Sequence, residues 1–245
     1  MRPGNYRFRF RLVPTLMLFI LVPLFTSLGF WQLDRAQFKR DLAATIEQRS
    51  RLPVASLETL SADPHELQYR TVRASGELEA EGQFFIENRR RGGRTGFHVV
   101  TPLRLDDGRT RLLINRGWVA TPRDGGLPEA EVPDGPVTVT GEVYIPLPPA
   151  LQLHSGPEAA REWGRRWPYM TVDLFRATVD YPVMPFLLLQ QPDDPHGFVR
   201  EWPREQPSDG MHIGYAVQWF AFALIVILIY LRLGLSRRGA AEAAP

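Results

Sequence analysis

The apolar residues of this chain concentrate near its two ends. Segments 12–33 and 210–231 each run for 22 residues without a charged side chain. At about 1.5 Å of rise per residue, a helix of that length crosses a hydrocarbon core about 30 Å thick. The pattern predicts two transmembrane helices, 12–33 and 210–231. It excludes a soluble protein, and two spans are too few for a polytopic transporter or channel.

The region between the spans carries strand patterns separated by turns. Residues 34–50 hold helix formers without Gly or Pro, and we expect them to continue the first helix. We predict an antiparallel β-rich (α+β) domain over 34–209, with a short helix at 172–179 and loops at 122–136 and 146–168. The predicted strands are 69–79, 83–90, 97–105, 109–119, 136–145 and 185–191.

One turn in this region is well specified. Asp106-Asp107-Gly108 separates two apolar runs. An Asp-Gly pair tolerates the positive φ that tight hairpins need. We therefore expect strands 97–105 and 109–119 to pair across it.

The two tails are basic, whereas the region between the spans is acidic. Residues 1–11 carry four arginines (+4), and residues 232–245 carry three arginines and one glutamate (+2). The remaining 22 basic and 26 acidic residues give the middle region a charge of −4. Positively charged tails stay in the cytoplasm. The sequence thus predicts cytoplasmic tails at 1–11 and 232–245 and a periplasmic domain at 34–209, in a cell inner membrane.

The first span has features of a secretory signal peptide. Its basic start fits one, but the apolar stretch is too long and no small-x-small cleavage site follows it. Bulky residues, Phe30 and Trp31, stand where a peptidase needs small ones. We interpret the segment as an uncleaved signal anchor with Trp31 at the membrane interface.

The composition excludes several functional classes. The chain has no cysteine, which excludes disulfides, thiolate metal sites, c-type haem attachment and cysteine catalysis. It also lacks the GxSxG, HExxH, Walker A and dinucleotide-binding glycine motifs, so no enzyme is predicted. The acidic middle region argues against nucleic-acid binding.

The histidines show no metal-ligand spacing such as i, i+4 on a helix. His98 lies in an apolar strand run and is interpreted as a hydrogen-bonded sheet residue. His154 and Ser155 share a loop without the geometry of a nucleophile pair. Segment 192–196 (PDDPH) could bind a cation, but a solvated turn is the favoured interpretation.

His212 differs from these because it opens the second span. At 100° per residue, one helix face holds His212, Tyr215, Ala216, Trp219 and Phe222. Neutral imidazole is the usual nitrogen ligand of haem iron, and the aromatic rings could support a planar macrocycle. The alternative is an interfacial histidine above an aromatic belt. The spacing alone leaves both interpretations open.

Two further polar features need an interpretation. Gln218 lies about 9 Å deeper than His212, and a buried amide there is expected to bond to the first span. Segment 89–94 (RRRGGR) could meet haem propionates, an acidic partner or lipid headgroups. A solvated hairpin loop is the favoured interpretation of that cluster.

Together, several motifs resemble the Surfeit locus protein 1 family of cytochrome oxidase assembly factors, over nearly the whole chain. They occur here in order, from the end of the first span to the start of the second: 29–35 (GFWQLDR), 96–103 (GFHVVTPL), 115–119 (NRGWV), 139–141 (VTG) and 212–220 (HIGYAVQWF). The resemblance leaves the role of 115–118 open, and a tight strand-end turn that holds Trp118 in the core is the simplest interpretation.

The resemblance implies a non-enzymatic assembly factor, or chaperone, for a haem-copper terminal oxidase. It would bind haem a transiently and aid its insertion into the catalytic subunit of cytochrome c oxidase, with haem a synthase as a further candidate partner. His212 matches the family's axial haem ligand and Trp219 its aromatic neighbour; Tyr215 joins them by helical spacing. The first span has no histidine to act as a second axial ligand. The alternative is a haem-free membrane scaffold that stabilises an assembly intermediate.

Overall fold

The computed structural model describes residues 6–60, 63–150, 156–202 and 208–237. The chain divides into two compact units. One is a helix pair built from the described parts of 1–45 and 205–245, and the other is a β domain within 46–204. The two long helices and the β-rich domain expected from the sequence are thereby confirmed.

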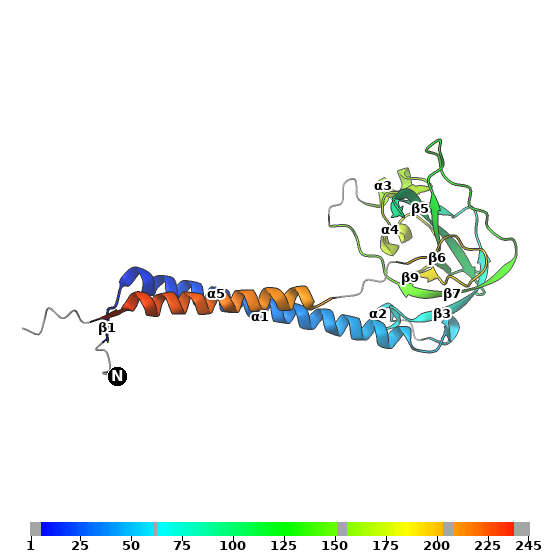
Figure 1. The fold of residues 1–245 in the computed structure, drawn as a ribbon. Helices are drawn as coiled ribbons and strands as arrows, with labels where there is room; N and C mark the ends of the chain where they lie inside the picture. Colours follow the sequence, from blue (N-terminus) through cyan, green and yellow to red (C-terminus); the bar gives the residue numbers. More distant parts are fainter. Residues whose placement is uncertain (1–5, 61–62, 151–155, 203–207, 238–245) are drawn as a thin grey trace, which may run out of the picture. The chain divides into compact units, whose positions relative to one another are not determined.

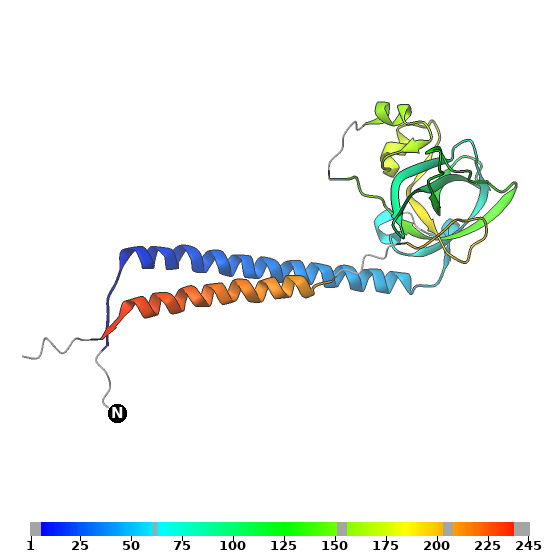
Figure 2. The same cartoon turned by 45° about the horizontal axis from the view of Figure 1, so that its top comes forward.

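The helix pair consists of α1 (Leu12–Ser50) and α5 (Gly210–Gly234), which lie side by side in Figures 1 and 2. Both are long and apolar enough to cross a membrane. Residues 34–50 continue the first helix, as expected, and Pro23 lies inside it without ending it.

The two helices pack along a seam of residues spaced alternately by three and four. This is the heptad spacing of antiparallel coiled coils, which keeps one face turned to the partner. Gly29 allows close approach, because a Cβ there would lie 2.6 Å from the Phe220 ring. The buried or half-buried seam residues are Thr15, Leu18, Val22, Phe25, Gly29, Gln32 and Ala36 on α1, and His212, Ala216, Trp219, Ala223, Val226 and Tyr230 on α5.

A two-stranded sheet joins the chain ends next to the helices. β1 (Tyr6–Phe8) pairs antiparallel with β10 (Leu235–Arg237). The Phe8 ring packs edge-on against Tyr230, and a Cβ on Gly234 would lie 2.2 Å from that Phe8 ring. Both tails therefore leave the helix pair at the same end.

The β domain is a barrel with additional strands. The sheet order is β2-β3-β7-β9-β6-β5-β4-β8, and the additional β3–β5 pairing closes five strands into a ring. Gly76 makes closure possible, because a Cβ there would lie 2.1 Å from the Arg104 carbonyl oxygen. The strands are β2 (Ala55–Ser56), β3 (Thr71–Leu78), β4 (Phe84–Arg91), β5 (Arg94–Leu105), β6 (Arg111–Ala120), β7 (Pro136–Tyr144), β8 (Arg166–Trp167) and β9 (Val183–Gln190).

Short helices accompany the barrel. They are η1 (Leu57–Thr59), α2 (Pro64–Leu67), α3 (Pro157–Glu162) and α4 (Val172–Arg176). One apolar cluster fills the barrel, with Leu103, Ile114 and Phe186 fully buried. A second cluster, which includes Phe84 and Phe175, lies where α3 and α4 pack on the sheet.

Most strand pairs are antiparallel, as predicted, and the expected hairpin is present. Leu103 faces Leu112 across it, and Gly108 has a φ of +67°. Asp107 caps the turn by accepting two backbone N–H groups and the Thr110 hydroxyl. The pairs β2–β3, β4–β8 and β6–β9 are parallel. The last of these belongs to the barrel, and no local sequence pattern indicates it.

A β-bulge in β6 places an arginine inside the domain. Val99 lies opposite Gly117 and Val100 opposite Asn115, so Arg116 is the extra residue. The motif 115–119 therefore lies within a strand, and its interpretation as a strand-end turn is wrong. Trp118 is buried, as that interpretation required.

The buried Arg116 guanidinium connects two loops to the barrel. It donates to the carbonyl oxygens of Glu131 (2.7 Å) and His196 (2.6 and 3.0 Å), and to the Gln83 amide oxygen (3.2 Å). It also lies over the Phe198 ring, 5.0 Å from its centroid. Within the described residues, each oxygen that it contacts is uncharged. Burial, with a smaller effect of Arg200, lowers the pKa of Arg116 to about 10.

Arg116→Met should destabilise the β domain. Methionine preserves the length of the apolar stem of Arg116 but leaves several buried carbonyl groups without a hydrogen-bond donor. The free energy of unfolding should therefore fall by about 3 kcal/mol. Thermal unfolding followed by tryptophan fluorescence measures this, with Arg90→Met as the control, because Arg90 is exposed on β4. Equal unfolding midpoints for the two variants would show that the guanidinium does not stabilise the loops.

Candidate functional site

The first turn of α5 brings His212 against the first helix. Its Nδ1 lies 2.8 Å from the Oε1 of Gln32, across the helix seam. Just before α5 begins, Arg40 of α1 forms an ion pair of 2.7 Å with Asp209. The Arg40 guanidinium holds the pKa of Asp209 below its usual value. These two contacts fix where α5 starts relative to α1, and with it the position of the imidazole.

The structure divides the predicted aromatic face into two parts. Trp219 lies in the seam, where it stacks on Phe25 with ring centroids 5.6 Å apart at 27°. Tyr215 is 47% exposed on the open side, whereas Phe222 is 36% exposed and packs on Phe25 and Trp219, with ring centroids 5.7 and 5.8 Å away. His212 lies at the boundary, half-buried. The site residues therefore form a packed side and an open side, with the imidazole between them.

Space is available beside the histidine. A Cβ on Gly214 would have no heavy atom within 4 Å, and Tyr215 follows it on the exposed side. A planar ligand could approach here without displacing a helix. An aromatic plane and a ring nitrogen are the groups that such a ligand would contact.

The expectation for Gln218 is wrong. Its side chain is exposed on α5 and, within the described residues, forms no hydrogen bond to the first helix. The amide that crosses the seam is instead Gln32, which belongs to the motif 29–35. Gln218 lies 240° around the helix from His212, so its amide cannot face the seam that His212 faces.

His98 is a sheet residue, as expected. Its Nδ1 lies 3.4 Å from the Asn115 amide nitrogen, and its ring packs edge-on against Trp202. Burial, and to a lesser extent Arg89, lower the pKa of His98 to about 4. The imidazole is therefore neutral at physiological pH, and its surroundings are those of a structural residue.

The PDDPH segment is also structural. Asp194 accepts the backbone N–H of Thr140, and the His196 carbonyl accepts from Arg116. No group of three His, Asp or Glu side chains within the described residues could hold a metal ion. His154 and Ser155 lie outside the described residues.

The arginine cluster 89–94 forms the β4–β5 hairpin. Gly92 and Gly93 make its turn with positive φ. Arg91 pairs with Glu201, and the Arg89 carbonyl accepts the Trp118 indole N–H at 2.8 Å. The preferred interpretation, a hairpin loop, agrees with this structure.

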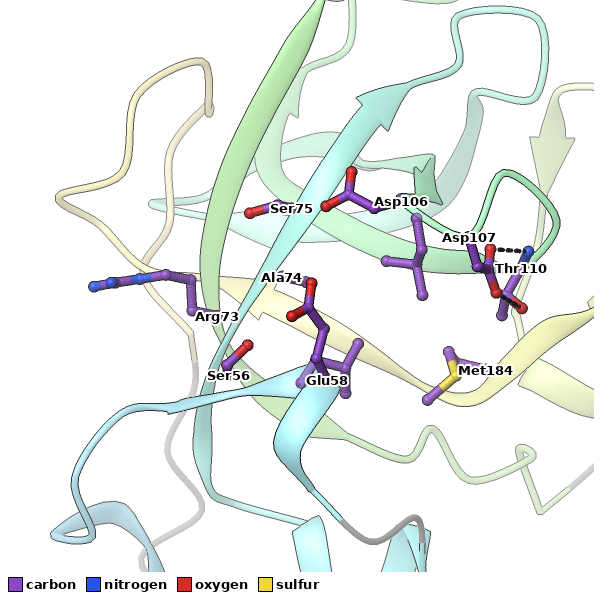
Figure 3. A pocket seen from close by; sticks show the side chains of 11 residues that line it. Ser56, Glu58, Arg73, Ala74, Ser75, Asp106, Asp107, Thr110 and Met184 are labelled. Atoms are coloured by element: carbon purple, nitrogen blue, oxygen red, sulfur yellow. Dashed lines mark hydrogen bonds between the residues drawn. The ribbon is translucent and has the colours of Figure 1, made fainter.

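The β domain also contains a cavity of about 250 Å³. Figure 3 shows the Glu58, Asp106 and Asp107 carboxylates around it, together with Met184. Asp107 is already bonded to Thr110, as the dashed lines mark. The lining mixes carboxylates with apolar side chains and contains no histidine, so it offers no imidazole to haem iron.

Comparison with known proteins gives one consistent family. A sequence model of the SURF1 family matches residues 19–224, which include both Gln32 and His212. The chain is 25% identical over 236 residues to a SURF1-like protein of Monosiga brevicollis, covering 85% of this chain and 83% of that protein. These matches confirm the resemblance inferred from the ordered motifs.

Two further relatives match over shorter segments. The chain is 35% identical over 120 residues to Surfeit locus protein 1 of Mus musculus, covering 42% of this chain and 38% of that protein. It is 30% identical over 95 residues to the cytochrome oxidase assembly protein SHY1 of Saccharomyces cerevisiae, covering 38% of this chain and 24% of that protein. The matches therefore span less than half of the mouse and yeast proteins.

The low pKa of His98 predicts a specific pH dependence of stability. The unfolded chain takes up the proton near pH 6.5, but the folded protein only near pH 4. The free energy of unfolding should therefore fall by up to about 3 kcal/mol as the pH drops through this window. The difference in denaturant midpoint between wild type and His98→Gln, measured from pH 4 to 7.5, isolates this contribution. Parallel pH profiles would contradict it.

Proposed function

This chain belongs to the SURF1 family, and we propose that it is a membrane-bound assembly factor for a haem-copper terminal oxidase, cytochrome c oxidase. The name of the yeast relative, a cytochrome oxidase assembly protein, supports the proposal. The role is that of a chaperone and not of an enzyme. The helix pair would hold the chain in the lipid bilayer, and the catalytic subunit of the oxidase would be its partner.

We further propose that it carries haem a through His212. The observation that carries this proposal is the placement of His212 at the boundary between the packed seam and the open side of α5. The residues there fit a haem: one imidazole, the exposed aromatic ring of Tyr215, and open space beside Gly214. Trp219 would support the ligand from the packed side.

A single axial histidine suits a carrier. α1 contains no histidine, so the helix pair offers the iron one imidazole. With one imidazole to hold it, the haem would be released more easily than from a site that supplies two. The haem would then pass to the catalytic subunit, with haem a synthase as the candidate source.

The second candidate function is a haem-free scaffold. In support of it, the polar contact of His212 and the stacking of Trp219 on Phe25 are both satisfied within the helix pair. In that case these residues would stabilise helix packing and dock an assembly intermediate. Absorbance of the purified protein separates the two functions, because only the carrier should retain haem from cells that make haem a.

We propose the orientation that the tail charges favour, with residues 1–11 and 232–245 in the cytoplasm and 34–209 in the periplasm. The β1–β10 pairing supports the part of this topology that keeps both tails on one side.

His212→Ala should abolish haem retention and leave membrane insertion intact, because it removes the iron ligand without adding a charge to the span. Trp219→Ala should weaken retention less, by about 1–3 kcal/mol for a lost stacking surface. His98→Ala, in the β domain, should retain wild-type haem. The measurement is Soret absorbance per protein after expression with haem a synthesis. Wild-type haem in His212→Ala would favour the scaffold.

The orientation is tested with a compartment-sensitive reporter. Alkaline phosphatase, which folds only in an oxidising compartment, should be active when inserted in the 122–136 loop and inactive when fused after residue 245. Activity of the C-terminal fusion would reverse the proposed topology.

A further inference from the structure

Gln32 offers the His212 imidazole a defined hydrogen-bond acceptor. Its Oε1 lies 2.8 Å from Nδ1. With the amide oxygen turned toward the imidazole, as in this structure, Gln32 can only accept, so in the neutral imidazole Nδ1 carries the proton and Nε2 keeps its lone pair. The contact therefore selects one of the two tautomers. Nε2 becomes the nitrogen available to a metal.

The packing of the two helices along the seam determines where Gln32 lies. It stands between Gly29 and Ala36, the two most buried residues of this part of α1. Gly29 lets α5 approach closely through Phe220, and the Arg40–Asp209 ion pair fixes the adjacent helix start. An amide in such an apolar seam needs a polar partner, and the imidazole is the one it meets.

We propose that Gln32 is the positioning residue of the haem ligand: it orients the His212 ring, fixes its Nδ1–H tautomer and sets how strongly Nε2 donates to iron. This inference rests on the proposed haem-carrying function. Metal-bound histidines in general donate their second ring N–H to an acceptor that fixes ring orientation and raises ligand basicity. Here the acceptor is neutral, so it keeps the imidazole from becoming the strong imidazolate-like donor that a carboxylate would favour. A weaker iron bond agrees with a cargo that must be released.

The first test needs no haem. Histidine-selective ¹⁵N NMR of the full chain in detergent, with His212 assigned by difference against His212→Ala, should show the Nδ1–H tautomer in wild type. Gln32→Leu, which removes the acceptor at similar volume, should shift His212 toward the Nε2–H tautomer. Gln32→Glu, which restores an acceptor, should keep the Nδ1–H form. An unchanged His212 tautomer in Gln32→Leu would overturn the proposal.

The second test uses the haem-loaded protein. Gln32→Leu should weaken haem a affinity by 10- to 100-fold, on the order found for lost outer hydrogen bonds of metal ligands. Gln32→Glu should bind haem, raise the iron–histidine stretching frequency of the ferrous form and lower the midpoint potential, because a carboxylate makes Nε2 a stronger donor. Gln37→Leu is the matched control, since Gln37 is an exposed glutamine of α1 that bonds to Asp41. It should resemble wild type in every measurement.

The outcomes distinguish this inference from the function on which it rests. Wild-type haem affinity in Gln32→Leu, or an unchanged iron–histidine stretch in Gln32→Glu, would overturn the role of Gln32 while His212 remains the ligand. If Gln32→Leu and Gln32→Glu lost thermal stability equally, with the same tautomer as wild type, Gln32 would be a packing residue only. Wild-type haem content in His212→Ala, or no haem in the wild type, would overturn the carrier function and the inference together.

Discussion

Close packing of two apolar helices determines where polar groups can lie in this protein. In hydrocarbon, a polar side chain without a partner is costly, and small residues at a seam allow the approach that brings partners within reach. Gly29 and the buried Ala216 and Ala223 supply that approach. The polar contacts lie at the two ends of the seam, Thr15 with Tyr230 and Gln32 with His212.

The β domain also buries a polar group, the charged Arg116 side chain, but it supplies hydrogen-bond partners in a different way. Arg116 carries a full charge into the interior, where it meets carbonyl and amide oxygens and no carboxylate among the described residues. Burying an ion pair in its place would require two charges to lose water. Instead, neutral oxygens from different segments of the chain accept the hydrogen bonds of the guanidinium. They also tie the segments around Glu131 and His196 to a single point in the barrel.

Local sequence patterns predicted the elements of this fold better than the contacts between them. The long apolar runs, the Asp-Gly turn and the strands from 69 to 145 depend on neighbouring residues, and the structure contains them. The parallel β6–β9 pair joins segments separated by about sixty residues, which no local pattern encodes. The bulge that buries Arg116 is likewise defined by pairing with β5.

The candidate site shows the same division. His212 and Trp219 stood out in the sequence because they lie on one helix within one motif. Gln32 belongs to another motif of the same resemblance. The helical periodicity of α5, however, does not tell which residue of α1 lies against His212. Gln218 was expected to be buried because it is an amide inside a span, although its angular position on α5 already turned it away from His212.

The parallel β6–β9 pair has a consequence for how the chain is made. β9 ends at Gln190, and α5 begins at Gly210. A ribosome that has synthesised β3 to β7 has produced most of the barrel, but the ring cannot close before β9 exists, and contacts so distant in sequence form slowly. The barrel and the second membrane helix therefore become available almost together. Completion of the β domain and insertion of α5 are therefore both late events in the biogenesis of this protein.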